Sequence, residues 1–345
     1  EQGEPMSKQF GAAVLGTGDV SGEYIKAFEA DPRSQVRAIL SRDRARAEAK
    51  AREYGLANCR ACTNLDELLK CGDIQLVSIC TPHHLHVEQG VACAQAGKHV
   101  VVEKPIALDL AGLRKLDAAV REHNVRSVTG FVLRWNPLFE TIKAILADGT
   151  IGDVFYGEVD YLHGITKDLH LYPWLSRRAF GGTALLTAGC HAVDGLRWFV
   201  GQEAVEVFGY ANFSKGNPLD YEYEPNSVTL IKFADGTMGK VATSIEYMAP
   251  YTFPIALMGN RGTIRDNRLF TKRWPGQTGW AVIPTMTPDS GAVTHHPFRL
   301  LISHLIDCVM SGAESHCNVA DAVKTHEICI AGELSRLEAR PVKLP

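Results

Sequence analysis

The chain has 345 residues, of which 46% are hydrophobic and 22% are charged, and its formal net charge at pH 7 is −3. We expect two domains, because this length exceeds what one hydrophobic core usually organises. The near-neutral charge argues against nucleic-acid and anionic-membrane partners, and no apolar run approaches the roughly 20 residues that span a bilayer.

Buried strands alternate with helices along the first 131 residues. The expected strands are Gln9–Leu15, Gln35–Leu40, Ile74–Ile79, His99–Val102 and Val125–Phe131. The expected helices are Glu23–Ala30, Arg42–Tyr54, Leu85–Ala96 and Leu108–His123. Apolar strands separated by helices, several of which end at glycine, predict a parallel sheet with helices on both faces.

The glycines after the first strand identify what this sheet is expected to bind. Gly16 allows a sharp turn, Gly18 allows close approach of the backbone, and the next helix offers its N-terminal amides to a pyrophosphate. Ser21 replaces the usual third glycine with another small residue. The segment expected to contact a dinucleotide is Gly16, Thr17, Gly18, Asp19 and Val20. A glycine turn without a ligand is the alternative.

The end of the second strand bears on the phosphate of the cofactor. Ser41 and Arg42 stand where an NAD-preferring site usually has a carboxylate, and Arg44 and Arg46 follow closely. Guanidinium groups can receive a 2′-phosphate, so NAD(P) is expected with NADP slightly favoured over NAD. Alternatively, these arginines form a solvated helix start beside Asp43.

The rhythm of the sequence changes after about Gly152. Longer alternating segments follow at Val154–Leu162, Ala204–Phe213, Ser227–Phe233, Met238–Tyr247 and Tyr251–Met258, and helical periodicity returns at Phe298–Cys308 and Val319–Arg340. Alternation is typical of antiparallel strands with one covered face. We therefore predict an α/β chain with a Rossmann domain at residues 6–128 and a second α/β domain at residues 129–345.

The nine cysteines are an odd number and are scattered along the chain. Reduced thiols in a cytoplasmic protein are the simplest account. Cys59 and Cys62 form a C-x-x-C pair that could be redox-active or half of a zinc site, but no second pair stands at zinc-finger spacing. We expect buried or incidental thiols and no metal.

Several motifs together resemble one family. They are Thr81-Pro82-His83-His84-Leu85-His86, Glu103-Lys104-Pro105, the run from Gly130 to Pro137, the run from Gly181 to Asp194 and the Pro-Val-x-Leu-Pro ending. Their order and spacing are similar to those of the glucose–fructose oxidoreductase and inositol dehydrogenase family (Gfo/Idh/MocA). The resemblance covers essentially the whole chain.

This resemblance implies an oxidoreductase of the EC 1.1.1 class that acts on a secondary alcohol or carbonyl of a sugar, glycoside or polyol. It implies a large open sheet in the second domain, substrate in the cleft between the domains, and a homo-oligomer, either a dimer or a tetramer. Lys104 and His191 are the implied proton-transfer residues. A lysine shielded from water beside a cofactor can exchange protons near neutral pH, and histidine does so with little adjustment. Further implied cofactor contacts are Thr81, Pro82, His86, Glu103, Lys104 and Arg134.

Thr187 departs from the family pattern. Many members have Asp four residues before the histidine, and a hydroxyl cannot carry the negative charge of an Asp–His–Lys relay. Thr187 is kept among the catalytic candidates. Three readings stay open: simple hydride transfer, a glycosidase or lyase that retains NAD and oxidises C3 transiently, and a dinucleotide sensor without turnover.

Substrate contacts are expected from polar and aromatic residues of the second domain. One stretch supplies His163, Lys167, His170, Tyr172 and Trp174, and a second supplies His295 and His296. Hydroxyl donors and acceptors beside aromatic faces suit a sugar. A structural histidine or buried aromatic is an equally good account of each. Asp194 is expected to be a structural partner rather than a catalyst.

Overall fold

The computed structural model describes residues 9–285, 288 and 295–345 and divides into two compact units. Unit 1 contains the described residues through Val132 together with His296–Val323. Unit 2 contains the described part of Leu133–His295 together with Lys324–Pro345. The two domains predicted from the sequence, 6–128 and 129–345, are continuous, and the first one does not include His296–Val323. Residues 6–8 lie outside the described residues.

Unit 1 is built on a parallel sheet of six strands in the order β3-β2-β1-β4-β5-β6. The strands are β1 (Phe10–Leu15), β2 (Ser34–Leu40), β3 (Arg60–Cys62), β4 (Leu76–Ile79), β5 (His99–Val102) and β6 (Ser127–Thr129). The helices of this part of the chain are α1 (Asp19–Ala30), α2 (Arg44–Glu53), α3 (Leu65–Leu69), η1 (His83–Leu85), α4 (His86–Gln95) and α5 (Leu110–Glu122). The predicted Rossmann sheet is confirmed.

Helix α10 (Phe298–Ser311) explains why the chain returns to unit 1. The ring of Phe298 meets the edge of Tyr24 on α1, with 5.0 Å between the ring centroids. Near the other end of α10, Asp307 forms an ion pair with Arg33. A helix whose apolar face packs on α1 completes the cover of the sheet, whatever its distance in sequence.

Unit 2 is built on a sheet in the order β15-β14-β13-β12-β7-β11-β10-β9-β16, with β8 paired to β11. Its strands are β7 (Val154–Val159), β8 (Tyr161–Leu162), β9 (Ala204–Asn212), β10 (Asn226–Phe233), β11 (Met238–Ser244), β12 (Ile255–Gly259), β13 (Gly262–Arg265), β14 (Arg268–Thr271), β15 (Ala281–Val282) and β16 (Val342–Lys343). Its helical segments are α6 (Pro137–Ala147), α7 (Tyr172–Leu175), α8 (Arg178–Gly181), η3 (Leu185–Gly189) and α9 (Cys190–Val200), while η2 (Val132–Trp135) and α11 (Val319–Glu338) span the two units.

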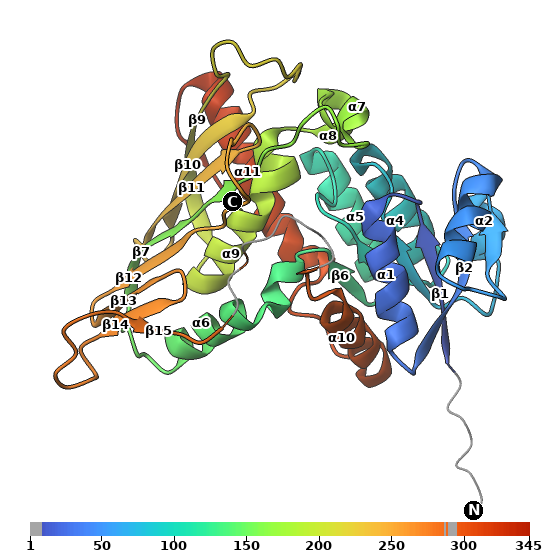
Figure 1. Ribbon diagram of the computed structural model, residues 1–345, viewed down its shortest axis with the longest axis horizontal. Coiled ribbons are helices and arrows are strands. Elements are labelled where there is room, and N and C mark those ends of the chain that lie inside the picture. The colour runs from blue at the N-terminus through green and yellow to red at the C-terminus, as the bar shows by residue number, and fades with distance from the viewer. Residues whose placement is uncertain (1–8, 286–287, 289–294) are drawn as a thin grey trace, which may run out of the picture. The chain divides into compact units, whose positions relative to one another are not determined.

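Helices cover one face of this large sheet (Figure 1). Leu196 of α9 packs where Gly157 and Gly239 leave room for it, and α11 approaches β9 so closely that a Cβ at Gly209 would lie 2.6 Å from the carbonyl oxygen of Gly332. The predicted open, mostly antiparallel sheet is confirmed. The predicted strand Val154–Leu162 is divided at Asp160, because β7 and β8 are separate there.

Within the described part of the chain, no helix has both the length and the apolar content that a membrane crossing needs. In the same residues, no group of three or more His, Cys, Asp and Glu side chains could hold a metal ion.

Candidate functional site

The glycine turn after β1 leaves the start of α1 open to an anion. Gly16 has a φ of +106°, and a Cβ there would lie 2.6 Å from the carbonyl oxygen of Cys80, so only glycine fits. The N-cap residue of α1, Gly18, has no side chain to cap the helix, whereas Asp43 caps α2 and Asp109 caps α5. Uncapped amides at a helix N-terminus are suited to a phosphate group. The residues present therefore fit a dinucleotide pyrophosphate.

The carboxylate that follows the end of β2, Asp43, is engaged by the backbone of the next helix. Asp43 accepts a hydrogen bond of 2.9 Å from the backbone N–H of Ala45 and thereby caps α2. Arg42 and Arg46 are exposed. His84 lies in η1, which follows β4, and β1 stands between β4 and β2 in the sheet. The pKa of His84 is lowered by burial and then by the positive charge of Arg42. The Arg42 guanidinium is thus close enough for its charge to act on the His84 ring.

Lys104 follows β5, and its neighbour Glu103 is buried. The Tyr24 hydroxyl donates a hydrogen bond of 2.7 Å to Oε1 of Glu103, and the backbone N–H of Lys104 donates one of 3.1 Å to Oε2. A Cβ at Gly130 would lie only 2.7–3.0 Å from the carboxylate atoms of Glu103. The structure therefore places Glu103, predicted as a cofactor contact, in the interior of unit 1.

His86 holds the other side of the Lys104 loop. Its imidazole is buried between the carbonyl oxygen of Pro105, 2.8 Å from Nδ1, and that of Thr81, 2.7 Å from Nε2. Both partners are acceptors, so a neutral ring donates to only one of them at a time. Burial lowers the pKa of His86, although the two backbone bonds act in the opposite direction. Its side chain links the segments after β4 and β5 instead of facing a ligand.

Arg134, predicted as a cofactor contact, has a different role in the structure. Its buried guanidinium makes two hydrogen bonds to Asp194, Nε–Oδ2 at 2.8 Å and Nη2–Oδ1 at 2.6 Å. The hydroxyl of Thr325 donates to the same carboxylate, and the guanidinium lies 4.6 Å from the centre of the Trp198 ring. This bidentate pair joins η2, α9 and α11, so Asp194 takes the structural role predicted for it.

His191 lies near the start of α9 in a group of aromatic rings that we call the His191 cluster: His191, Tyr161, His163 and Tyr251. The rings of His191 and Tyr161 are stacked, with 6.1 Å between centroids and 11° between planes. Tyr251 meets Tyr161 and His163 edge-on, and the Tyr161 hydroxyl is 3.3 Å from Nδ1 of His163. Burial raises the pKa of both tyrosines, so both keep their protons near neutral pH.

Of the four residues in the His191 cluster, His191 and His163 were named as candidates from the sequence, but Tyr161 and Tyr251 were not. A period of two would have found Tyr161, because residues 161 and 163 of an extended segment point to the same side. Thr187 is buried in η3, a single π-helical turn that leads directly into α9. Single π-helical turns are rare in proteins as a whole, and those that occur often lie at functional sites.

Most of the other predicted substrate residues lie elsewhere. Tyr172 is buried in a core with Tyr221 and Tyr223, and its hydroxyl accepts a hydrogen bond from the backbone N–H of Asp220. Trp174 packs against that core, whereas Lys167 and His170 are exposed. His295 is exposed and His296 stacks on Phe298. Of the predicted substrate residues, His163 is therefore the one in the His191 cluster.

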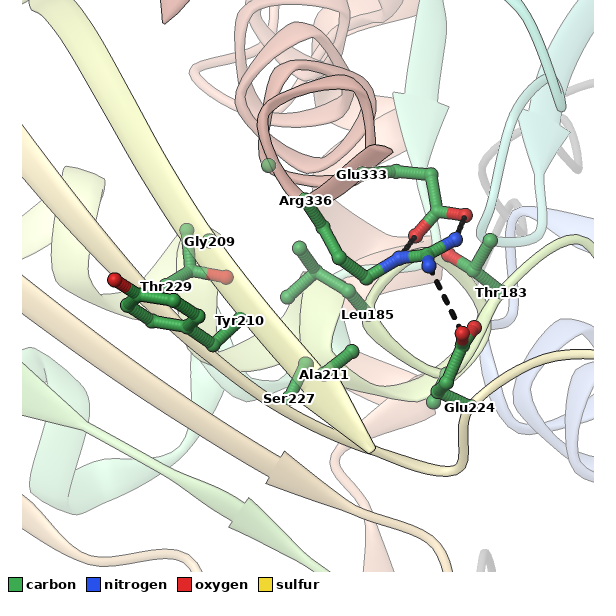
Figure 2. Close-up of a pocket in the computed structure, with 12 residues that line it drawn as sticks. Thr183, Leu185, Gly209, Tyr210, Ala211, Glu224, Ser227, Thr229, Glu333 and Arg336 are labelled. Carbon is green, nitrogen blue, oxygen red and sulfur yellow. Dashed lines mark hydrogen bonds and ion pairs between the residues drawn. The ribbon is translucent and has the colours of Figure 1, made fainter. Parts of the chain in front are cut away.

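A small pocket in unit 2 does not compete for this role. It lies between β9, β10 and α11, where Arg336 bonds to Glu333 and Glu224 (Figure 2). Its volume of about 10 Å³ admits roughly one water molecule. The pocket is therefore too small for a sugar, and its charged groups already bond to each other.

Comparison of the sequence with protein-family models shows the family to which the chain belongs. Residues 10–131 match the model of an oxidoreductase family with an NAD-binding Rossmann fold, and residues 139–265 match that of the GFO/IDH/MocA C-terminal domain. The chain belongs to the Gfo/Idh/MocA family. It is an oxidoreductase with an NAD-binding Rossmann domain, as the order of its motifs predicted.

Relatives of this Gfo/Idh/MocA chain include named dehydrogenases. An uncharacterized oxidoreductase of Synechocystis sp. is 32% identical over 60% of this chain and 56% of its own length. The scyllo-inositol 2-dehydrogenase (NAD(+)) of Bacillus subtilis is 27% identical over 98% of this chain and 97% of its own. The solved structure of GenD2 from gentamicin A biosynthesis, in complex with NAD, has a TM-score of 0.83 and 26% identity, covering 100% and 99% of the two chains.

Proposed function

We propose that this protein is a freely exchanging NAD(P)-dependent dehydrogenase or reductase of a secondary alcohol or carbonyl in a sugar or polyol. The observation that carries the proposal is the shared edge of one parallel sheet. The glycine turn follows β1 and Lys104 follows β5, two strands away, which corresponds to roughly 10 Å. Ligands of open parallel sheets bind at this carboxyl edge. The names of two relatives, a scyllo-inositol 2-dehydrogenase and a protein of gentamicin A biosynthesis, support the substrate class.

The bound dinucleotide would supply the hydride donor or acceptor at its nicotinamide ring. We assign the accompanying proton transfer at the substrate oxygen to Lys104 and His191. In oxidation, the hydroxyl proton passes to one of these groups as the carbon–oxygen double bond forms. The start of α1 holds the pyrophosphate, and Tyr161, His163 and Tyr251 supply hydroxyl, imidazole and ring surfaces for the substrate.

Thr187 limits which groups can take part in the proton transfer. Its hydroxyl stays uncharged near neutral pH, so His191 has no carboxylate at this position to stabilise its protonated form. We propose that Thr187 orients rather than ionises, and that Lys104 and His191 suffice for simple hydride transfer.

For the cofactor's phosphate, we propose a preference for NADP over NAD. Arg42 and His84 together can receive a 2′-phosphate, and Asp43 is engaged as a helix cap instead of repelling it. The NAD in the names of two relatives belongs to those proteins. Binding of the two dinucleotides to Arg42 variants tests this preference.

For quaternary structure, we propose a homo-oligomer in which a second copy covers the open face of the large sheet. That face exposes Tyr210, Val228, Leu230, Met238 and Met258 on neighbouring strands. Its central lysine, Lys240, already bonds to Glu158 and Asp160, so a second copy meets paired charges. Leu230→Asp should lower the mass in solution measured by light scattering, whereas Leu337→Asp, an exposed leucine on α11, should not.

A reducing, cytoplasmic location is also part of the proposal. All nine cysteines lie in the described residues, and none of them forms a disulfide. Burial raises the pKa of Cys59 to about 11 and raises that of Cys62, which makes this pair a poor redox centre.

The first experiment identifies the retained cofactor. The purified protein is denatured and any released dinucleotide is identified by mass spectrometry. The emptied protein is then titrated with NAD and NADP and assayed with scyllo-inositol, myo-inositol, glucose and methyl glucoside. We expect little retained dinucleotide and net formation of reduced nucleotide. Stoichiometric NAD with sugar release and no net reduction would instead indicate the glycosidase, and tight binding without turnover on any sugar would indicate a sensor.

A further inference from the structure

We propose that Tyr24 is a positioning residue for Lys104: through the buried carboxylate of Glu103, its hydroxyl ties the helix that follows the glycine turn to the backbone of Lys104. The inference deepens the proposed function, because it rests on proton transfer by Lys104. The coupling between α1 and the Lys104 backbone, both in unit 1, can also be measured without turnover.

The geometry of Glu103 carries the proposal. Its two oxygens bond to different elements: Oε1 accepts from Tyr24 on α1 at 2.7 Å, and Oε2 accepts from the Lys104 backbone N–H at 3.1 Å. A carboxylate is planar and moves as one body, so a displacement of α1 is passed to the Lys104 backbone. The proposed pyrophosphate site is at the N-terminus of this same helix.

Packing leaves this bridge little freedom. The Tyr24 side chain is fully buried, and the ring of Phe298 on α10 packs edge-on against its ring, with 75° between the ring planes. Behind the carboxylate, Gly130 approaches so closely that an added Cβ would touch both oxygens. The bridge is therefore enclosed by residues from two distant parts of the sequence, Phe298 and Gly130.

The hydrogen bond from Tyr24 affects the charge of the Glu103 carboxylate. Burial raises the pKa of Glu103, while the positive charge of Lys104 and the Tyr24 hydrogen bond oppose that rise. The other titratable neighbours are Tyr24 itself and the Cys80 thiol, whose pKa values burial and Glu103 both raise, so neither supplies a charge. Without the Tyr24 hydroxyl, the pKa of Glu103 should rise further and the carboxylate should take up a proton at higher pH.

The test compares Tyr24→Phe with Tyr223→Phe. Tyr223 is an equally buried tyrosine whose hydroxyl also donates one 2.7 Å bond, to the carbonyl oxygen of Leu175 in unit 2. Amide hydrogen exchange of residues 103–107 is measured with and without NADH, and kcat is measured against pH. In the parent protein and in Tyr223→Phe, NADH should slow exchange of this segment. In Tyr24→Phe that protection should be lost and kcat should fall about tenfold, with an altered pH profile and little change in NADH affinity.

A second variant probes the same carboxylate from behind. Gly130→Ala pushes against Glu103 and leaves Tyr24 in place, so it should also remove the NADH-dependent protection. If Tyr24→Phe keeps both the protection and the pH profile of Tyr223→Phe, the positioning role is overturned. Full turnover in Lys104→Ala, with the protection lost in Tyr24→Phe, would instead overturn the proposed function and leave the coupling intact.

Discussion

Lys104 and His191, the two residues assigned to proton transfer, are held in different ways. The residues on both sides of Lys104 are fixed by buried hydrogen bonds, Glu103 to Tyr24 and Pro105 to His86. His191 stacks on Tyr161, in a cluster in which the Tyr161 hydroxyl also lies 3.3 Å from Nδ1 of His163. A hydrogen bond fixes both the direction and the distance of its partners, whereas aromatic rings are held by their contact surfaces in offset-stacked or edge-on arrangements. We therefore expect the segment around Lys104 to tolerate substitutions less well than the His191 cluster does.

Removal of Lys104 should have the largest effect. Lys104→Ala should lower kcat by about a thousandfold, because a positioned acid–base group contributes roughly 10²–10⁴ in rate. The affinity for NADH, measured by fluorescence, should change little. Lys115→Ala, at an exposed lysine of α5, is the control and should leave kcat unchanged. Full turnover in Lys104→Ala would show that the fixed geometry of its loop serves another purpose.

Arg134 tests whether unit 2 also depends on one directional interaction. Arg134→Met leaves Asp194 buried without its cation and should reduce the free energy of unfolding by about 3–5 kcal/mol. Because the guanidinium faces Asp194, the affinity for NADH should be preserved. The double variant Arg134→Met with Asp194→Leu should recover much of the stability in denaturant titrations. Weak NADH binding with unchanged stability would restore the cofactor role that the sequence predicted.

Substitutions in the His191 cluster should distinguish residues that affect kcat from residues that affect KM. His191→Asn removes a proton acceptor and should lower kcat about a hundredfold. Tyr161→Phe keeps the stacked ring but loses the hydroxyl near His163, so it should raise KM several-fold and leave kcat nearly unchanged. Steady-state kinetics on the same substrate distinguish the two. A large kcat loss in Tyr161→Phe would mean that the His191 cluster tolerates substitutions no better than the segment around Lys104 does.

The smallest expected effect is the pH dependence of the affinity for NADP, which carries a 2′-phosphate. The pKa of His84 is lowered, so the ring is neutral at pH 7 without a ligand, and a bound phosphate favours its charged form. NADP binding should therefore take up a proton and tighten as the pH falls. Between pH 8 and 6.5 the gain should be about threefold, since a phosphate with a pKa near 6 keeps most of its charge there.

Two controls accompany this titration by calorimetry. NAD, which lacks the 2′-phosphate, should bind equally well across the range. Arg42→Ala should weaken NADP binding about tenfold and affect NAD little. Equal pH dependence for both dinucleotides would remove His84 from the phosphate site.

The sequence predicted unit 1 well because its apolar strands, glycine turns and helices are local patterns. It did not predict α10 in that unit, since periodicity reveals an apolar helical face but not the sheet it covers. The family resemblance implied that Arg134 contacts the cofactor, and nothing in the local sequence points to its partner Asp194, sixty positions later. The aromatic partners of His191 come from β8 and from the segment before β12, so only the folded chain brings them together.

The return of α10 has a consequence for synthesis on the ribosome. Domains generally begin to fold while the chain is still being translated. Here the face of α1 that carries Tyr24 stays uncovered until Phe298 and the residues after it have emerged, when most of the chain has been made. Nascent chains that stall earlier expose this apolar surface, so they are the expected clients of chaperones and proteases.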